Sequence, residues 1–86
     1  MTAALDGNAI AGQLYEVFGA EMTTAVGVCA HCGAEGLVAE CVVYLDGPGI
    51  VVRCRSCIGV LAVLVRRRQT TCVDLRGLET LERGTE

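Results

Sequence analysis

The sequence predicts a small, metal-stabilised, mainly-β domain with an N-terminal α-helix, and three observations lead to this prediction. The chain has 86 residues, a length that suits one domain. Two Cys-x-x-Cys segments, Cys29–Cys32 and Cys54–Cys57, offer four metal ligands. Short apolar segments of strand length follow each of them. We therefore expect a single domain over residues 1–86, in which a zinc-binding antiparallel sheet is accompanied by one helix.

The composition explains why such a chain would need a metal. It contains one Phe, two Tyr and no Trp, so the large aromatic side chains that usually contribute most to a core are scarce. A chain of this size also buries a modest fraction of its surface on folding. The apparent zinc affinity of small structural sites is roughly 10 kcal/mol or more, and this binding free energy becomes folding free energy.

The first predicted element is a helix over residues 6–20. Four apolar residues fall on one helical stripe: Ile10, Leu14, Val17 and Phe18. Asp6 or Asn8 can cap the N-terminus of this helix, and Gly19 can end it. We expect the stripe to cover the domain's own sheet, and docking of the stripe on a partner is the alternative.

The middle of the chain, residues 26–76, is predicted to form a ribbon of strands around the two Cys-x-x-Cys segments. Residues 23–28 are an extended lead into the first segment. Residues 37–46 alternate between apolar and polar side chains, which predicts a half-buried strand. After a turn over residues 46–49, residues 50–53 predict the returning strand that leads into the second segment.

Two further strands are predicted after the second Cys-x-x-Cys segment. Residues 60–66 form a near-continuous apolar run, which suits a central strand. After a polar turn, residues 71–75 predict another strand with Val73 and Leu75 directed inward. The last segment, residues 77–86, has Leu78 and Leu81 beside four charged residues and is predicted as a tail that adds one turn or frays.

The paired cysteines predict the metal site. A Cys-x-x-Cys segment can fold as a tight knuckle that directs two thiolates to one point, and two knuckles supply the soft ligands of a tetrahedral Zn²⁺ site. The predicted ligands of one Zn²⁺ per chain are Cys29, Cys32, Cys54 and Cys57. Four thiolates leave no open position for water, so we expect a structural metal and no enzyme activity. His31 lies inside the first knuckle, and we expect its side chain to be exposed and not bound to the metal.

The order of knuckle, hairpin, knuckle and hairpin resembles a zinc ribbon over residues 26–76. The resemblance rests on the two cysteine pairs, Gly33 and the Gly-Pro-Gly turn. More closely, the chain is similar to a small uncharacterised zinc-ribbon family of high-GC bacteria, through Leu5–Gly12, both knuckles and Val73–Leu78. This resemblance implies the fold and the metal but no activity. Arg55 stands where many ribbon knuckles have Pro, which makes the second knuckle more basic.

Six cysteines could also form disulfides, and the compartment decides between disulfides and metal ligation. Residues 1–8 show neither the basic nor the apolar segment of a secretory signal peptide. The longest apolar run, residues 60–65, is too short to span a membrane. We therefore expect a cytoplasmic protein with reduced thiols, metal ligation and no membrane partner.

Two cysteines lie outside the predicted metal site. Cys41 falls on the apolar side of its predicted strand, and we expect it to be a small buried hydrophobe. Cys72 is expected to be more exposed. A reactive thiol at Cys72, activated by the nearby Arg66–Arg68, is the alternative for this residue.

A cluster of arginines raises a second possible function. Five arginines could converge at one end of the sheet and contact phosphates: Arg53, Arg55, Arg66, Arg67 and Arg68. The net charge of −3 and the scarcity of aromatic side chains argue against nucleic-acid binding. A solvated turn is the simpler interpretation, and pairing with an acidic protein surface is a third.

These patterns favour a zinc-binding structural module that acts as an accessory or protein-interaction partner. The first alternative is a zinc ribbon that binds nucleic acid through the arginine cluster. The second is a rubredoxin-like iron site that passes electrons to an oxidoreductase, although the low aromatic content argues against it. The sequence does not name the partner, the pathway or the oligomeric state, and it does not by itself separate zinc from iron.

Overall fold

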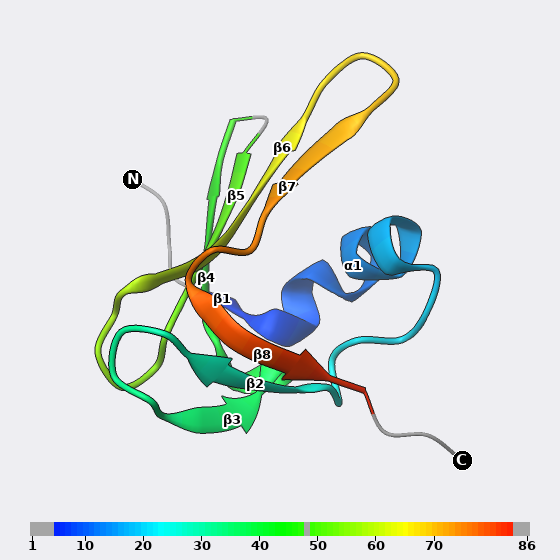
Figure 1. Cartoon of the computed structure of the whole chain (residues 1–86). Coiled ribbons are helices and arrows are strands. Elements are labelled where there is room, and N and C mark those ends of the chain that lie inside the picture. Colours follow the sequence, from blue (N-terminus) through cyan, green and yellow to red (C-terminus); the bar gives the residue numbers. More distant parts are fainter. Residues whose placement is uncertain (1–4, 48, 84–86) are drawn as a thin grey trace.

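The computed structural model describes residues 5–47 and 49–83, which form two antiparallel sheets and one short α-helix (Figure 1). The five-stranded sheet has the order β1-β4-β5-β6-β7, and the three-stranded sheet has the order β3-β2-β8. The strands are β1 (Leu5–Asp6), β2 (Val26–Cys29), β3 (Glu35–Leu37), β4 (Val42–Asp46), β5 (Gly49–Arg53), β6 (Val60–Arg66), β7 (Thr71–Asp74) and β8 (Leu78–Glu82). This architecture confirms the predicted mainly-β fold with an N-terminal helix and a four-cysteine cluster.

The N-terminal helix begins as a 3₁₀ turn, η1 (Gly7–Ile10), and continues as the α-helix α1 (Ala11–Phe18). The backbone N–H of Asn8 donates to the Asp6 carboxylate at 3.0 Å, so Asp6 is the cap. Gly19 ends the helix in the left-handed conformation, with a φ of 72°, as predicted. Within the residues that the structure describes, no helix has the length and apolar character needed to cross a membrane.

The apolar stripe of this helix lies against the chain's own core. Ile10 is fully buried, Leu14 is 5 % exposed, and Val17 and Phe18 pack against the same cluster. The rest of the core comes from both sheets and from the loop after α1: Met22, Ala25, Cys29, Val43, Val52, Cys54, Leu61, Ala62 and Leu64. The stripe therefore packs on the domain's own sheets, as expected, with Val17 and Phe18 partly exposed.

The single strand predicted over residues 37–46 is wrong, because a turn interrupts it. The chain instead forms β3, then the 3₁₀ turn η2 (Val38–Glu40), then β4. The first two N–H groups of η2 donate to the carbonyls of Ala25 and Thr23, each at 2.9 Å. A Cβ on Gly7 would overlap the first carbonyl of η2, so η1 also packs tightly on this turn. These contacts move the chain from the three-stranded sheet into the five-stranded sheet.

The segment predicted as a tail from residue 77 contains a strand. β8 pairs antiparallel with β2, and Gly27 lies opposite Leu81. Leu78 and Leu81 pack against the core, which accounts for a strand in an otherwise charged segment. The ribbon therefore extends beyond its predicted end at residue 76, because pairing with β2 outweighs a weak local pattern.

The strands after the second knuckle form where they were predicted. Val73 faces the same side of the sheet as its partner Leu64 but remains 36 % exposed, because β7 is an edge strand. Leu75 packs against the core as predicted. The hairpins β4–β5 and β6–β7 extend away from the three-stranded sheet, and α1 lies on one side of them (Figure 1).

Candidate metal centre

The two Cys-x-x-Cys segments come together beside the core. Cys29 is the last residue of β2, Cys54 follows β5, and Cys32 and Cys57 lie in the turns that come next. The four sulfur atoms lie within 4.8 Å of one another. The Sγ atoms of Cys29 and Cys57 are 3.7 Å apart, and those of Cys32 and Cys54 are also 3.7 Å apart. A tetrahedron with metal–sulfur bonds of about 2.3 Å has edges of about 3.8 Å, so this cluster could hold one metal ion.

The first knuckle is closed by backbone hydrogen bonds on both sides. The N–H of Gly33 donates to the carbonyl of Cys29, and the N–H of Cys29 donates to the carbonyl of Ala34, both at 2.9 Å. The N–H of His31 donates to Cys29 Sγ at 3.3 Å, and the N–H of Ala34 donates to the sulfur of Cys32. These donors orient the two sulfurs and stabilise their thiolate forms.

The second knuckle repeats this plan. The N–H of Ile58 donates to the carbonyl of Cys54 at 2.9 Å, and the N–H of Cys54 donates to the carbonyl of Gly59 at 2.8 Å. The N–H of Ser56 donates to Cys54 Sγ, and the N–H of Gly59 donates to Cys57 Sγ, both at 3.3 Å. The same spacing of cysteines has therefore produced the same turn twice.

The cluster has a buried side and an exposed side. Cys29 is 2 % exposed and Cys54 is 5 % exposed, and both belong to the apolar core. Cys32 and Cys57, the second cysteine of each knuckle, are exposed. A metal bound here would join the core to both knuckles, and its four sulfur ligands would leave no open coordination position.

The four thiols influence one another's ionisation. The N–H of Cys57 is the main cause that lowers the pKa of Cys54 to about 6, and the N–H of Ser56 and the neighbouring thiols add to it against the effect of burial. The N–H of Ala34 favours the Cys32 thiolate, yet burial and the other three sulfurs raise the pKa of Cys32 to about 12. A bound divalent cation would allow all four sulfurs to be deprotonated, because its positive charge offsets the repulsion between the thiolates.

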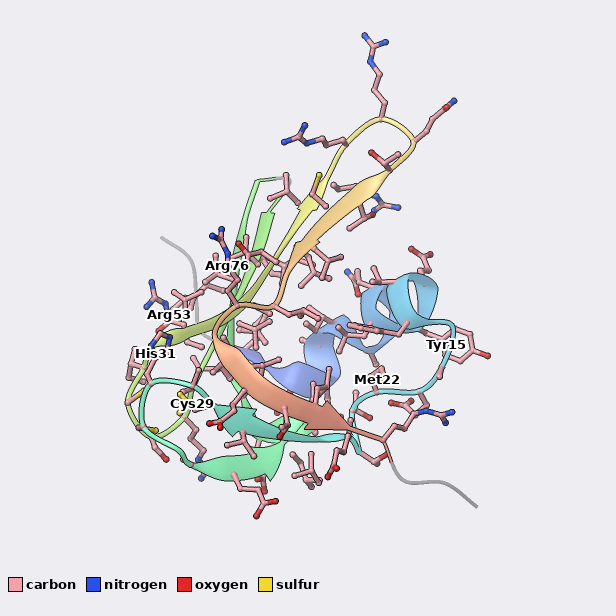
Figure 2. All side chains as sticks on the ribbon, in the orientation of Figure 1. Tyr15, Met22, Cys29, His31, Arg53 and Arg76 are labelled. Atoms are coloured by element: carbon pink, nitrogen blue, oxygen red, sulfur yellow. The ribbon has the colours of Figure 1, made fainter. Side chains whose placement is uncertain are left out.

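His31 contacts the second knuckle instead of the metal cluster. It is exposed, and its Nε2 lies 2.9 Å from the carbonyl oxygen of Val60, to which it can donate. A Cβ on Gly59 would lie 2.7 Å from the imidazole Cδ2, so the ring packs on this glycine. Figure 2 shows His31 and Cys29 at the same end of the molecule. The exposed position was predicted, but the bridge between the knuckles was not.

Gly77 also joins the two knuckles, a role for which no local sequence pattern gives a signal. The N–H of Ala30 donates to the carbonyl of Gly77 at 2.9 Å, and the N–H of Gly77 donates to the carbonyl of Leu61 at 3.1 Å. A Cβ on Gly77 would overlap the carbonyl oxygen of Val60. The backbone therefore passes so close to the strand after the second knuckle that only glycine fits.

The arginines do not converge, which corrects the expectation of one basic patch. Arg53 pairs with Val60 at the start of β6, whereas Arg66 pairs with Thr71 at its end. Six residues of strand separate the two positions, which is about 20 Å at roughly 3.3 Å per residue. Arg55 stays in the second knuckle. The patch needed for phosphate contacts by all five arginines is therefore not formed.

The remaining cysteines lie outside the metal cluster. Cys41 is half-buried against the core, and its Sγ lies 3.8 Å from the carbonyl oxygen of Leu37. Burial is the main cause that raises the pKa of the Cys41 thiol, which fits its predicted role as a small hydrophobe. Cys72 is exposed on β7, opposite Val65, as expected. A reactive thiol at Cys72 stays a prediction.

The comparisons with known proteins concern the family and not an activity. No curated protein and no solved structure matches this chain at a significant level. One family model, described as a family of unknown function, DUF6510, matches residues 1–86. Since the match spans the whole sequence and the four-cysteine cluster fits a zinc ribbon, the chain belongs to the DUF6510 family.

Proposed function

We propose that this chain is a zinc-binding structural module that acts as a non-catalytic accessory partner of another protein in the cytoplasm. The observation that carries the proposal is the four-sulfur cluster, in which two sulfur–sulfur distances of 3.7 Å match the edge of a closed tetrahedral metal site. An apolar face on the adjoining five-stranded sheet supports the interaction role. A reducing compartment suits the chemistry, since thiolates must stay reduced to bind a metal.

The ligand set supports zinc in a structural role. Four thiolates from two knuckles are the usual ligands of structural Zn²⁺, and a catalytic zinc keeps one position for water. Two of the sulfurs belong to the core, so a bound ion would tie the two sheets together at the point where the chain has few large side chains. Binding free energy would then contribute directly to folding.

The outer face of the five-stranded sheet supports a protein-binding role. The strand register places five side chains on the face opposite α1: Val42, Tyr44, Val51, Val63 and Val65. All five are partly exposed, whereas Val43, Val52 and Ala62 on the inner face are buried. Within residues 5–47 and 49–83, no helix or strand covers this outer face (Figure 1). The same register places Arg53 and Asp74 on this face, so it combines apolar with charged side chains, as interaction sites commonly do.

Charged groups at the edge of this face are of the kind found at protein interfaces. The Arg53 guanidinium lies over the Tyr44 ring, 5.9 Å from its centroid. Arg76 pairs with Asp74 at 2.7 Å, and Asp74 lies opposite Val63 in the strand register. Figure 2 shows Arg53 and Arg76 on the side of the molecule away from α1. Arginine and tyrosine are enriched in protein interfaces, so a partner with an apolar centre and an acidic rim fits this surface.

Metal content tests the first half of the proposal. The chain is purified from its native host, and zinc and iron per chain are measured together with the visible absorption spectrum. One zinc and no visible band support the structural module. One iron with reversible reduction would instead assign an electron carrier, and a folded chain without metal would remove the metal site.

Site-specific crosslinking tests the second half. A photo-reactive amino acid is placed at Val63 on the outer face and, as the matched control, at Arg68 in the turn after β6. A discrete adduct is expected from position 63 and not from position 68, and the further change Val51→Lys should remove it. Zinc content verifies that each variant is folded. The same adduct from both positions, or no adduct from position 63, would contradict an interface on this face.

A further inference from the structure

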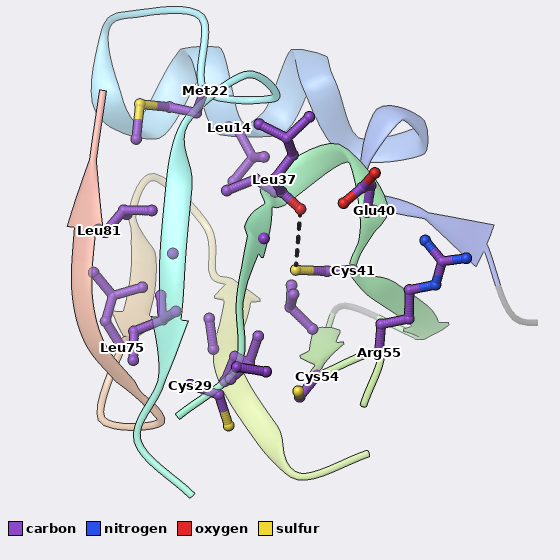
Figure 3. Close-up of a pocket in the computed structure, with 18 of the residues that line it drawn as sticks. Leu14, Met22, Cys29, Leu37, Glu40, Cys41, Cys54, Arg55, Leu75 and Leu81 are labelled. Carbon is purple, nitrogen blue, oxygen red and sulfur yellow. Dashed lines mark hydrogen bonds between the residues drawn. The ribbon is translucent and has the colours of Figure 1, made fainter. Parts of the chain in front are cut away.

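A cavity of about 130 Å³ lies between α1 and the two sheets (Figure 3). Its interior is formed by apolar side chains from both sheets, the helix and the segment before β8, and these include Leu14, Val52, Leu64, Leu75 and Leu81. Leu14 and Leu64 are also members of the buried core. The space therefore extends from the core of the domain to its surface, where it is lined by exposed residues that include Leu37 and Ser56.

Several of the residues that line the cavity are small. Gly27 on β2 and Gly36 on β3 contribute backbone only, and Ala34 and Ala62 contribute one methyl group each. Protein interiors are close-packed, with few voids larger than a water molecule. An apolar cavity of about 150 Å³ in another protein stays dry and binds benzene, so a space of this size can hold a small ligand.

The mouth of the cavity has charged groups of both signs. Glu35 from β3 lines the cavity. Glu40 from η2 and Arg55 from the second knuckle also line it (Figure 3). In the part of the chain that the structure describes, neither forms an ion pair; the pair found there joins Arg76 and Asp74. A charged ligand would lose its water in the apolar part of the cavity, which is unfavourable. An uncharged ligand avoids this penalty.

We propose that this cavity binds a small uncharged apolar molecule, of the size of benzene or a six-carbon alcohol. The hydrocarbon part takes the interior, and a hydroxyl group, where present, faces Glu40 and Arg55. Both side chains can hydrogen-bond to a hydroxyl, since one accepts and the other donates. This ligand site goes beyond the proposed function, because it does not involve the outer sheet face.

The cavity and the metal cluster share two side chains. Cys29 and Cys54 line the cavity and also belong to the group of four sulfurs. A molecule in the cavity packs against these two residues and favours the arrangement that holds the metal. Because coupling between two binding sites is reciprocal, the metal should increase affinity for the ligand to the same extent.

Binding to the metal-loaded chain tests this site. The probes are benzene and 1-hexanol, compared with hexanoate and hexylammonium, and the readouts are amide chemical shifts in NMR spectra and the unfolding midpoint. Saturable shifts concentrated on the cavity lining, and a higher midpoint, are expected for the uncharged probes. The charged probes should bind at least about tenfold more weakly.

Filling the cavity is the decisive variant. Ala62→Leu places a larger side chain in the space, whereas Val63→Leu, one residue further along β6, changes the outer face and serves as the matched control. Hexanol binding should be lost in the first variant and retained in the second. If Ala62→Leu does not retain its metal, Leu75→Phe fills the same space from another wall. Absence of saturable binding by both uncharged probes, equal binding by the filled variants, or tighter binding of a charged probe would overturn the proposal.

Discussion

The two knuckles share one hydrogen-bonding plan but differ at one backbone position. The residue after the second cysteine is Gly33 in the first knuckle, with a φ of 77°, and Ile58 in the second, with a φ of 64°. Glycine adopts this left-handed conformation readily, whereas the same conformation costs a β-branched residue roughly 1–2 kcal/mol. The second knuckle is therefore strained at a position where the first is relaxed.

In the strained second knuckle, side chains from elsewhere in the fold contact the backbone carbonyls that follow Cys57. Arg53 Nη1 donates to the carbonyl of Ile58 at 2.9 Å, and His31 Nε2 lies 2.9 Å from the carbonyl oxygen of Val60. The first knuckle is tied to the rest of the fold by a backbone bond from Ala30 to Gly77. Cysteine spacing therefore determines the turn, while contacts from elsewhere in the fold accompany the residue that is strained within it.

Removing one cysteine ligand from either knuckle should have the largest effect on stability. The effect should be the same for both knuckles, because each supplies two ligands to the same metal. Cys32→Ser and Cys57→Ser change equivalent exposed cysteines. Each should abolish tight metal binding and cooperative unfolding, because roughly 10 kcal/mol of apparent zinc affinity supports a thin core. Metal content and circular dichroism during thermal unfolding measure this.

The matched control is Cys72→Ser, which changes an exposed cysteine outside the cluster and should alter stability by about 0.5 kcal/mol or less. Retention of one metal and of cooperative unfolding by either Cys32→Ser or Cys57→Ser would show that the cluster is not a four-ligand site.

The contact that joins the knuckles at Gly77 should be the next most sensitive. In Gly77→Ala the new methyl group would overlap the carbonyl oxygen of Val60, which belongs to the main chain of a paired strand and cannot move freely. We expect a loss of about 3 kcal/mol in the free energy of unfolding, the upper range for overpacking.

Gly12→Ala is the control: nothing lies within 4 Å of the position that its methyl group would take, and it should stabilise α1 by about 0.5–1 kcal/mol. Equal effects of the two changes would contradict the close approach at Gly77.

Much of the metal centre could be predicted from the sequence, because it depends on local spacing. Each Cys-x-x-Cys segment closes within its own turn, so Cys29 and Cys54 could be paired with their partners without knowledge of the fold. The bridge from His31 to Val60 could not be predicted, because it depends on how the two knuckles face one another. The left-handed backbone at Ile58 was also missed, since isoleucine gives no local signal for that conformation.

The parts of the fold that sequence analysis missed depend on pairing between distant segments. The strand β8 was predicted as a tail because only Leu78 and Leu81 are apolar in it, and its pairing with β2 becomes evident only in the folded chain. The strand predicted over residues 37–46 has the right alternation, but bonds from η2 to Ala25 and Thr23 divide it. The strands β5 and β6 were predicted well from their apolar residues, and the helix predicted over residues 6–20 forms an α-helix over Ala11–Phe18 after the 3₁₀ turn η1.

Exchanging the residues that distinguish the knuckles should change stability in opposite directions. Gly33→Ile introduces strain into the first knuckle and should lower the free energy of unfolding by roughly 1–2 kcal/mol. Ile58→Gly relieves the strain in the second and should raise it by about 1 kcal/mol, since the greater freedom of glycine in the unfolded chain offsets part of the gain. The measurement is the denaturant midpoint of the zinc-loaded protein. A lower midpoint for Ile58→Gly would mean that the Ile58 side chain, although 46 % exposed, stabilises the knuckle through its contacts.

The smallest expected effect concerns the hydrogen bond from Arg53 to the carbonyl of Ile58. Arg53→Met keeps much of the aliphatic stem and removes the donor, and we expect a loss of about 1 kcal/mol. If this bond supports the strained backbone, the loss should fall below about 0.5 kcal/mol when Ile58→Gly is present, because a relaxed knuckle no longer depends on it. A double-mutant cycle on unfolding free energies measures this coupling. Arg68→Met, in the turn after β6, is the control and should be additive with Ile58→Gly. If the effects of Arg53→Met and Ile58→Gly on the unfolding free energy were additive, the hydrogen bond would not depend on the strain at Ile58. The two knuckles would then differ only in the backbone angle at this position.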